Sequence, residues 1–305
     1  MFDSPLSASA YDVLGVDPAA DDETLRKAYR LRLRQTHPDT GGDAARFIQV
    51  QRAWALVGTA EARTAYDRGH GFAREPGPRW DGWRAPSRRA DTRPRARSYG
   101  HPGGRRREQF LALIREWAGR GVEVADPYDP ALVRAAPVEI RRLLADALAE
   151  EATARIVADL GMGYTVWHDV ATGVSPDEKL DHVVLAPSGL YGVLSEDAGG
   201  PVRVRRGELV GDGVAGTPIA DLVAGIRALS RAARVRFGGA IVVLPDDDLP
   251  RPVDDLGKVR GIRTVLTSRS ALANLLRTGI PGAREIGGNE IFDVRTRMNQ
   301  TVRFA

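Results

Sequence analysis

The chain has 305 residues, of which 43% are hydrophobic and 28% are charged, a composition typical of a globular protein with room for two domains. It contains no Cys, which excludes disulfides and any zinc or iron–sulfur site with Cys ligands. The formal net charge is only +4, so the position of the charges says more about partners than their sum does. The first residues lack the basic and apolar regions of a signal peptide, and the apolar runs are too short to span a bilayer. We therefore expect a cytoplasmic protein with no membrane partner.

The first seventy residues show the spacing of short amphipathic helices. Asp21 or Asp22 can cap a helix, because a short carboxylate accepts hydrogen bonds from the free N–H groups of a first turn. From Leu25 to Thr36 the apolar residues recur at helical spacing. Pro38 ends this helix, since the residue before a proline is pushed out of the α region.

A second amphipathic helix is expected after a polar turn. Asp43 is its candidate N-cap. Phe47, Val50 and Trp54 then form an apolar stripe that can face the first helix. The pattern predicts two antiparallel helices joined by a short polar loop.

The tripeptide His37-Pro38-Asp39 stands in this loop. His37 ends the first helix, where the helix dipole favours a donor or a cation, and the loop is expected to be exposed and fixed by the two helix ends. The first helix has a basic face that includes Arg26, Lys27, Arg30 and Arg34. A His-Pro pair alone is usually a helix stop, and a basic face alone is usually a solvated face. The flanking residues favour a functional interpretation here.

This segment resembles the J-domain of DnaJ-type co-chaperones over residues 9–69. The matching strings, in chain order, are Tyr11-Asp12-Val13-Leu14-Gly15-Val16, Leu25-Arg26-Lys27-Ala28-Tyr29-Arg30, His37-Pro38-Asp39, Phe47, Ala53-Trp54 and Arg63-Thr64-Ala65-Tyr66-Asp67. The resemblance implies that the basic helix docks on an acidic surface of a DnaK-type chaperone and that the His-Pro-Asp loop couples docking to ATP hydrolysis. Clustered positive charge steers an acidic partner, and no cofactor is expected for this role.

Three residues depart from the family pattern. Thr36 stands where an aromatic residue usually precedes the His, and Arg32 and Arg34 occupy positions that Leu or Lys often fill. We expect these changes to affect packing and to leave the loop intact.

Residues 70–105 are rich in Gly, Pro and Arg and have no hydrophobic period, which predicts a disordered, flexible linker. Its arginines, with those just after it, are Arg74, Arg79, Arg84, Arg88, Arg89, Arg93, Arg95, Arg97, Arg105, Arg106 and Arg107. Arginines with interspersed aromatic residues can bind single-stranded nucleic acid weakly. We favour the simpler interpretation of a spacer.

The remaining residues predict an α/β domain. Helices are expected over 108–120, 137–160, 218–234 and 270–277, and strands over 164–168, 180–185, 189–194, 202–210, 239–244 and 263–266. The continuous apolar run at 239–244 is typical of a strand buried on both faces. This order indicates a mixed sheet with helices on both sides. A further strand is expected at Asn289–Val294.

This order and several strings resemble the nuclease-related domain, NERD, a branch of the PD-(D/E)XK restriction-endonuclease-like fold. The matching strings are Tyr164 to Val170, Asp181-His182-Val183-Val184, Pro187-Ser188-Gly189-Leu190-Tyr191 and Gly200-Pro201-Val202. The resemblance implies that an active member holds a divalent metal with a helix acid, the Asp of the Asp-His pair and an acid-x-Lys on the next strand. Carboxylates suit Mg²⁺ because hard cations prefer oxygen ligands.

The residues at these positions indicate a degenerate nuclease site. Asp181 is present, and Glu150 or Glu151 can be the helix acid, but Leu194-Ser195-Glu196 stands at the acid-x-Lys. Leu cannot ligate a metal, and Glu196 reverses the charge of the Lys. We therefore expect no catalytic residue and no bound metal. A shifted ligand is the alternative, since Glu196 lies on the same strand face as Leu194.

Two histidines have structural interpretations. We expect His182 to serve packing or hydrogen bonding, and His168 to be a satisfied histidine near the edge of the sheet rather than a ligand.

Together these patterns predict a J-domain at 1–69, the linker at 70–105, the NERD-like domain at 106–285 and a tail at 286–305. The predicted function is a co-chaperone that stimulates a DnaK-type chaperone, with a second domain that selects a client not named by the sequence. The alternatives are a Mg-dependent nuclease and a nucleic-acid-binding adaptor, each recruiting a chaperone through the J-domain.

Overall fold

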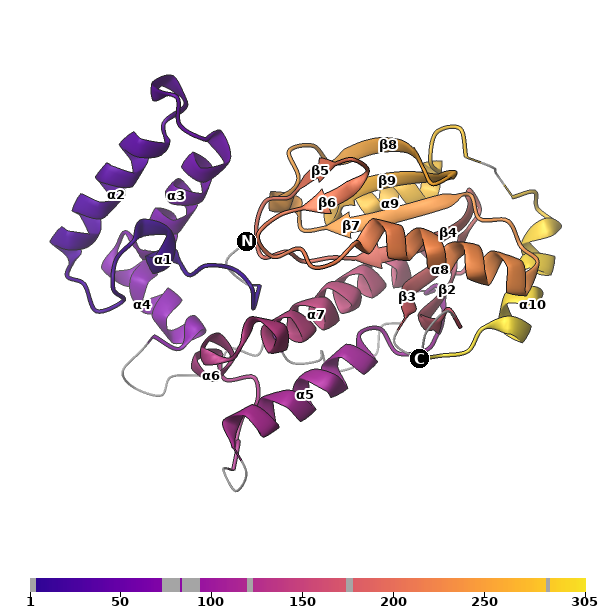
Figure 1. The fold of residues 1–305 in the computed structure, drawn as a ribbon, viewed down its shortest axis with the longest axis horizontal. Coiled ribbons are helices and arrows are strands. Elements are labelled where there is room, and N and C mark those ends of the chain that lie inside the picture. The colour runs from indigo at the N-terminus through magenta and orange to yellow at the C-terminus, as the bar shows by residue number, and fades with distance from the viewer. Residues whose placement is uncertain (1–3, 73–82, 84–93, 120–122, 174–177, 284–285) are drawn as a thin grey trace. The chain divides into compact units, whose positions relative to one another are not determined.

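The structure is a computed structural model that describes residues 4–72, 83, 94–119, 123–173, 178–283 and 286–305. The chain divides into two compact units (Figure 1). The helical unit contains residues 4–72, 83 and the described part of 113–141, and the sheet unit contains 94–112 and the described part of 142–305. A helical N-terminal segment followed by a mixed α/β domain is what the sequence predicted.

The helical unit starts with short helices whose caps are read directly from the sequence. They are α1 Ala10–Leu14, α2 Asp22–Thr36, the 3₁₀ turn η1 Pro38–Thr40, α3 Ala44–Val57 and α4 Ala60–His70. Ser9 and Asp12 form a capping box on α1. Asp21 accepts from the backbone N–H of Thr24, and Asp43 accepts from two N–H groups of α3. The expected caps at Asp21 and Asp43 are confirmed.

The core of these helices is small and contains both aliphatic and aromatic side chains. Its buried members are Ala10, Tyr11, Leu14, Leu25, Val50, Ala53, Val57 and Tyr66. Tyr29 of α2 stacks on Trp54 of α3 with ring centroids 4.4 Å apart, so the predicted apolar stripes do face each other. The Arg63 guanidinium on α4 donates to the carbonyls of Pro18 and Ala20, which ties the last helix to the turn before α2.

A later segment also belongs to the helical unit. The helix α6 Pro130–Ala135, capped by Asp129, packs against α4. The Arg134 guanidinium lies 4.0 Å from the centroid of the Phe72 ring, a geometry that favours a cation–π contact. The boundary between the two units falls inside α5 Gly104–Ala118 and α7 Val138–Ala158.

The sheet unit is built on seven strands in the order β1-β2-β3-β4-β7-β9-β8. The strands are β1 Arg97–Tyr99, β2 Thr165–Ala171, β3 Lys179–Ala186, β4 Gly189–Ser195, β7 Gly239–Leu244, β8 Val253–Val259 and β9 Ile262–Ser268. β2, β3 and β4 are antiparallel neighbours, whereas β4, β7 and β9 run parallel. All six residues of β7 are buried, as expected for a strand covered on both faces.

Helices cover both faces of this sheet. One hydrophobic cluster joins the sheet to α8 Pro218–Ala233 and α10 Glu290–Thr301, and the other joins it to the end of α7 and to α9 Arg269–Thr278. The expected sheet with helices on both sides is present. A short turn, η2 Asp246–Asp248, follows β7.

Three local expectations differ from the structure. The strand expected at Asn289–Val294 is wrong: this segment lies in α10, where Val294 and Met298 are buried at i, i+4 spacing. The strand expected at 202–210 is a hairpin of β5 Arg203–Arg205 and β6 Glu208–Val210, because Arg206 and Gly207 both have positive φ. Part of the expected linker is ordered, since β1 pairs in parallel with β2.

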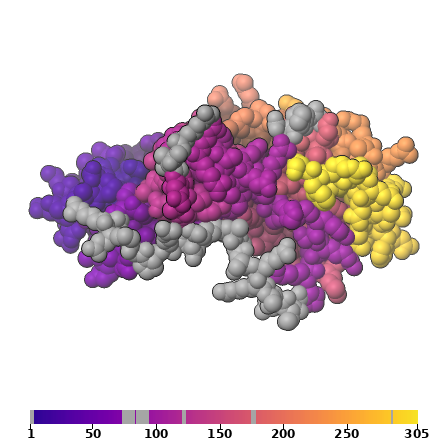
Figure 2. Space-filling model, turned by 90° about the horizontal axis from the view of Figure 1, so that it is seen from below, coloured from indigo at the N-terminus to yellow at the C-terminus, as the bar shows by residue number. Residues whose placement is uncertain are grey.

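The C-terminal residues complete the edge of the sheet. The Trp167 indole Nε1 donates to Asn299 Oδ1 at 2.9 Å, and the Ala171 N–H donates to the Arg303 carbonyl at 2.8 Å. Phe304 forms an isolated antiparallel bridge with Val170. Figure 2 shows this segment in yellow on the surface of the molecule.

Candidate functional site

The His37-Pro38-Asp39 loop closes on itself. His37 is the C-cap of α2 with extended backbone, and its Nδ1 accepts from the Asp39 N–H at 3.2 Å. The Thr40 hydroxyl donates to the carbonyls of Arg34 and His37 at 3.2 and 3.0 Å, and the Gly42 N–H donates to the His37 carbonyl at 2.9 Å. These local bonds fix the loop between the helix ends.

The side chains of His37 and Asp39 both face solvent. The side chain of His37 is 42% exposed and that of Asp39 is 87% exposed. The His37 ring meets the edge of the Phe47 ring at 5.0 Å between centroids, which anchors the histidine without burying its polar atoms. Gly42 is required for this closure, because a Cβ there would lie 2.3 Å from the carbonyl carbon of Thr36.

The basic face of α2 is exposed as expected. Arg26, Lys27, Arg30 and Arg34 are exposed, and none of the four has an ion pair with a carboxylate among the described residues. Arg32 behaves differently, since its Nε donates to the Leu14 carbonyl at 3.4 Å. Arg32, one departure from the family pattern, therefore satisfies a carbonyl at the C-terminal end of α1. Thr36, another departure, donates its hydroxyl to the Arg32 carbonyl.

The comparison with known families decides the identity of this segment. A family model described as "DnaJ domain" matches residues 9–67. Residues 9–67 form a J-domain. The expected J-domain is thus confirmed, with its His-Pro-Asp loop at the end of a basic helix.

Relatives of this J-domain occur in several proteins. It is similar to the "Tetratricopeptide repeat and J domain-containing co-chaperone DNJ1" of Mycosarcoma maydis, with 41% identity over 63 residues, 21% of this chain and 11% of the relative. It is also similar to "Chaperone protein DnaJ" of Methanothermobacter thermautotrophicus, with 41% identity over 73 residues, 21% of this chain and 19% of the relative. The same protein of Prochlorococcus marinus is 42% identical over 64 residues, 20% of this chain and 17% of the relative. The chain thus spans less than a fifth of each of these relatives.

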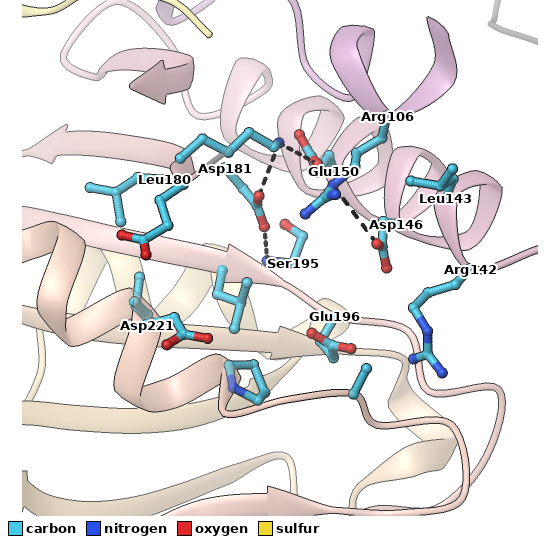
Figure 3. Close-up of a pocket in the computed structure, with 16 residues that line it drawn as sticks. Arg106, Arg142, Leu143, Asp146, Glu150, Leu180, Asp181, Ser195, Glu196 and Asp221 are labelled. Atoms are coloured by element: carbon cyan, nitrogen blue, oxygen red, sulfur yellow. Dashed lines mark hydrogen bonds and ion pairs between the residues drawn. The ribbon is translucent and has the colours of Figure 1, made fainter. Parts of the chain in front are cut away.

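Outside the J-domain, a buried lysine gathers three carboxylates in the sheet unit. The Lys179 Nζ lies 2.6 Å from Glu150 Oε1 on α7, 2.6 Å from Asp169 Oδ1 on β2 and 3.1 Å from Asp181 Oδ1 on β3. Figure 3 shows Glu150 and Asp181 of this group. We call these four side chains the lysine–carboxylate cluster. Its side chains are 1–9% exposed, and such burial makes an unpaired charge costly.

The predicted degenerate site comes together only in part. Glu150, Asp181 and Glu196 line one cavity of about 350 Å³ (Figure 3). Glu151, the other candidate for the helix acid, instead pairs with Arg107, with 2.6 Å between Oε1 and NH2. Of the two candidates, Glu150 is the one that lines the same cavity as Asp181.

Several site residues were missed from the sequence. Lys179 and Asp181 are two residues apart on β3, and this spacing was a usable signal that they share a strand face. Asp169 gave no such signal, because its place depends on a left-handed backbone with φ of 51°. Asp146 of α7 and Arg106 of α5 also line the cavity, 3.9 Å apart between Oδ2 and Nε.

Burial dominates the electrostatics of this cavity. Burial raises the pKa of Glu150, repulsion from Asp181 raises it further, and Lys179 opposes the rise. Burial lowers the pKa of Lys179, but the carboxylates of Asp181, Glu150 and Asp169 outweigh it, so the net pKa is raised and the amine stays charged. Burial raises the pKa of Glu196 to about 8, with repulsion from Asp146 and Asp181 adding to the effect.

A chain of hydrogen bonds runs beside the cluster. Ser98 Oγ lies 3.0 Å from His168 Nε2, His168 Nδ1 lies 2.7 Å from His182 Nδ1, and His182 Nε2 lies 3.0 Å from Ser195 Oγ. The Ser195 hydroxyl donates to Thr153 Oγ1 at 2.8 Å. Because the Ser195 hydroxyl donates its hydrogen to Thr153, Ser195 accepts a hydrogen bond from His182 Nε2. His182 Nδ1 then accepts from His168 Nδ1, and His168 Nε2 accepts from Ser98, so each ring carries a single N–H.

Both histidines are therefore neutral hydrogen-bonding groups. Burial lowers the pKa of His168 to about 4, and burial also lowers that of His182. Every ring nitrogen has a partner, as expected for satisfied histidines. Among the described residues no three His, Asp or Glu side chains are arranged to hold a metal ion. In the same part of the chain, no helix is long and apolar enough to cross a bilayer.

Replacing Glu196 by Gln should make the sheet unit less sensitive to pH. The folded protein keeps the Glu196 proton up to pH about 8, whereas an unfolded glutamate releases it near its ordinary value of 4.5. The wild type therefore loses stability as pH rises between these values, and Glu196→Gln should be the more stable by about 2 kcal/mol at pH 8.5.

Hydrogen exchange of β3 and β4 amides, compared at pH 5 and pH 8.5 after correction for intrinsic exchange, measures this difference. Glu108→Gln, an exposed glutamate in the same unit, is the matched control and should show no change. An equal effect of Glu196→Gln on stability at both pH values would contradict the raised pKa of Glu196 in the folded protein.

Proposed function

We propose that this protein is a co-chaperone that binds a DnaK-type chaperone and stimulates its ATP hydrolysis through His37-Pro38-Asp39. One observation carries the proposal: the loop is exposed and fixed at the end of a helix whose basic face includes Arg26, Lys27, Arg30 and Arg34. Exposed positive charge of this kind increases the rate of association with an acidic surface. The J-domain relatives named as chaperones and co-chaperones support the same role.

The basic face can be tested by reversing its charge. In the double variant Arg26→Glu/Arg30→Glu, the association rate constant with the DnaK-type chaperone should fall by about tenfold or more at low salt. The difference should shrink as salt is added, because screening weakens interactions between exposed charges. Surface plasmon resonance at several salt concentrations measures both effects.

The exposed Arg251 in the sheet unit offers a control, because the same Arg→Glu change can be made there, outside the basic face of α2. Arg251→Glu should leave the association rate unchanged. If the double variant associates as fast as the wild type, the basic face is not the docking surface.

For the sheet unit, we propose a degenerate restriction-endonuclease-like domain that selects a client or an anchoring site. The order of α7, the antiparallel strands β2 to β4, α8 and the parallel strand β7 supports this, since it follows the order expected from the resemblance to NERD. The meeting of Glu150, Asp181 and Glu196 in one cavity also supports it. The loss of the acid-x-Lys favours binding over hydrolysis as the role of this unit.

Nucleic-acid binding through the linker has less support. Arg74, Arg79, Arg84, Arg88, Arg89 and Arg93 lie outside the described residues. Of the others, Arg106 faces Asp146 and Arg107 pairs with Glu151. A carboxylate partner offsets the charge that an arginine would otherwise offer to a phosphate.

A further inference from the structure

The metal that the resemblance implies does not fit this cluster. Divalent Mg²⁺ and Ca²⁺ bind carboxylate oxygens at about 2.0–2.6 Å. The Lys179 Nζ is already 2.6 Å from one oxygen of Glu150 and of Asp169 and 3.1 Å from one oxygen of Asp181. A metal ion bound to these three oxygens would overlap the ammonium group.

The outer oxygens of Glu150 and Asp181 are engaged as well. Glu150 Oε2 accepts from the Gly103 N–H at 3.0 Å, and Asp181 Oδ2 accepts from the Ser195 N–H at 2.9 Å. A Cβ on Gly103 would lie 2.6 Å from the Ala147 carbonyl oxygen, so only glycine allows this N–H to approach α7. The backbone thus orients the carboxylates so that their free oxygens converge on Lys179.

We infer that Glu150, Asp169 and Asp181 form a cation site whose native occupant is the Lys179 ammonium, in place of a divalent metal. The inference rests on the resemblance proposed above for the sheet unit and deepens it. The lysine comes from the start of β3, two residues before Asp181 and on a different strand from the missing acid-x-Lys. The cluster then carries its own counter-cation, and the fold of the unit is independent of metal supply.

The first test uses the wild-type full chain, so it does not depend on any variant. The Lys179 ammonium should give a ¹⁵Nζ NMR signal at neutral pH, because its hydrogen bonds and burial slow proton exchange. Titration with MnCl₂ to a twofold excess should leave this signal, since a paramagnetic ion inside the cluster would broaden it. Broadening that Asp181→Asn removes would show that metal displaces the lysine, and would overturn the inference.

The second test removes the ammonium. Lys179→Ala should bind one Mn²⁺ at least tenfold more tightly than the wild type in a calorimetric titration, and Mn²⁺ should raise its melting temperature. Adding Asp181→Asn should abolish both effects. A folded Lys179→Ala that binds no more Mn²⁺ than the wild type would overturn the inference.

If Lys179→Ala does not fold even with Mn²⁺ present, the wild-type NMR titration decides alone. Stimulation of the chaperone ATPase is scored on the same wild-type sample. If metal binds the cluster of the wild type but the protein still stimulates the chaperone ATPase, the cation-site inference alone fails. If the protein does not stimulate the ATPase, the proposed co-chaperone function fails, and the Mn²⁺ titrations still test the cation site.

Discussion

His37→Gln should reduce stimulation of the DnaK-type chaperone to the basal rate of ATP hydrolysis. The Gln side chain keeps a polar group at this place, but it lacks the ring that meets Phe47 and the Nδ1 that accepts from the Asp39 N–H. The loop would then lose the contact that fixes the position of Asp39. Single-turnover ATP hydrolysis by the chaperone, with and without the full chain, measures the effect.

The variant should remain folded, because His37 is partly exposed and lies outside the J-domain core. Far-ultraviolet circular dichroism and an unchanged melting temperature verify this. His101→Gln makes the same chemical change at an exposed position of the sheet unit and should stimulate like the wild type. Full stimulation by His37→Gln would refute the proposed role of the loop.

Lys179→Met should destabilise the sheet unit by about 3–5 kcal/mol, because it leaves buried carboxylates without their cation. Met keeps most of the volume of the side chain, so the effect reports lost charge more than lost packing. Denaturant unfolding followed by hydrogen exchange of the β2, β3 and β4 amides locates the loss in this unit.

Lys258→Met supplies the control, since Lys258 is an exposed lysine on β8 of the same unit. Its effect should stay within about 0.5 kcal/mol. A loss below about 1 kcal/mol for Lys179→Met would mean that the carboxylates are neutralised in another way, for example by taking up protons.

The sequence was sufficient to predict the J-domain because its signals are local. A helix cap such as Asp43, a stop such as Pro38 and an apolar stripe such as that of Phe47, Val50 and Trp54 each act within a few residues. Each element therefore specifies its own bounds, and the loop between two helices follows from them.

The sheet unit was predictable as a set of elements and less so as a site. Glu150 and Glu151 are adjacent, and a rotation of about 100° per residue separates their directions on a helix. The sequence therefore could not choose between them, whereas the structure places only Glu150 against Asp181. Asp169 joins the cluster through one left-handed residue, a tertiary effect that no local pattern reveals. The error at Asn289–Val294 has a similar cause, because a short apolar run fits a strand or a helix until its packing partner is known.

The pairing of the C-terminal residues with β2 affects the order in which the two units can complete their folding during synthesis. Val170 bridges to Phe304, and the Trp167 indole bonds to Asn299, so these contacts span more than 130 residues of sequence. The packing of α1, α2 and α3 on one another lies within the first 57 residues, and such local contacts form early and fast. Because synthesis runs from the N-terminus, we expect the His-Pro-Asp loop to form while the sheet unit of the same chain is still incomplete. Under the proposed function, the nascent protein would present its docking loop before the contacts of the C-terminal residues with β2 are made.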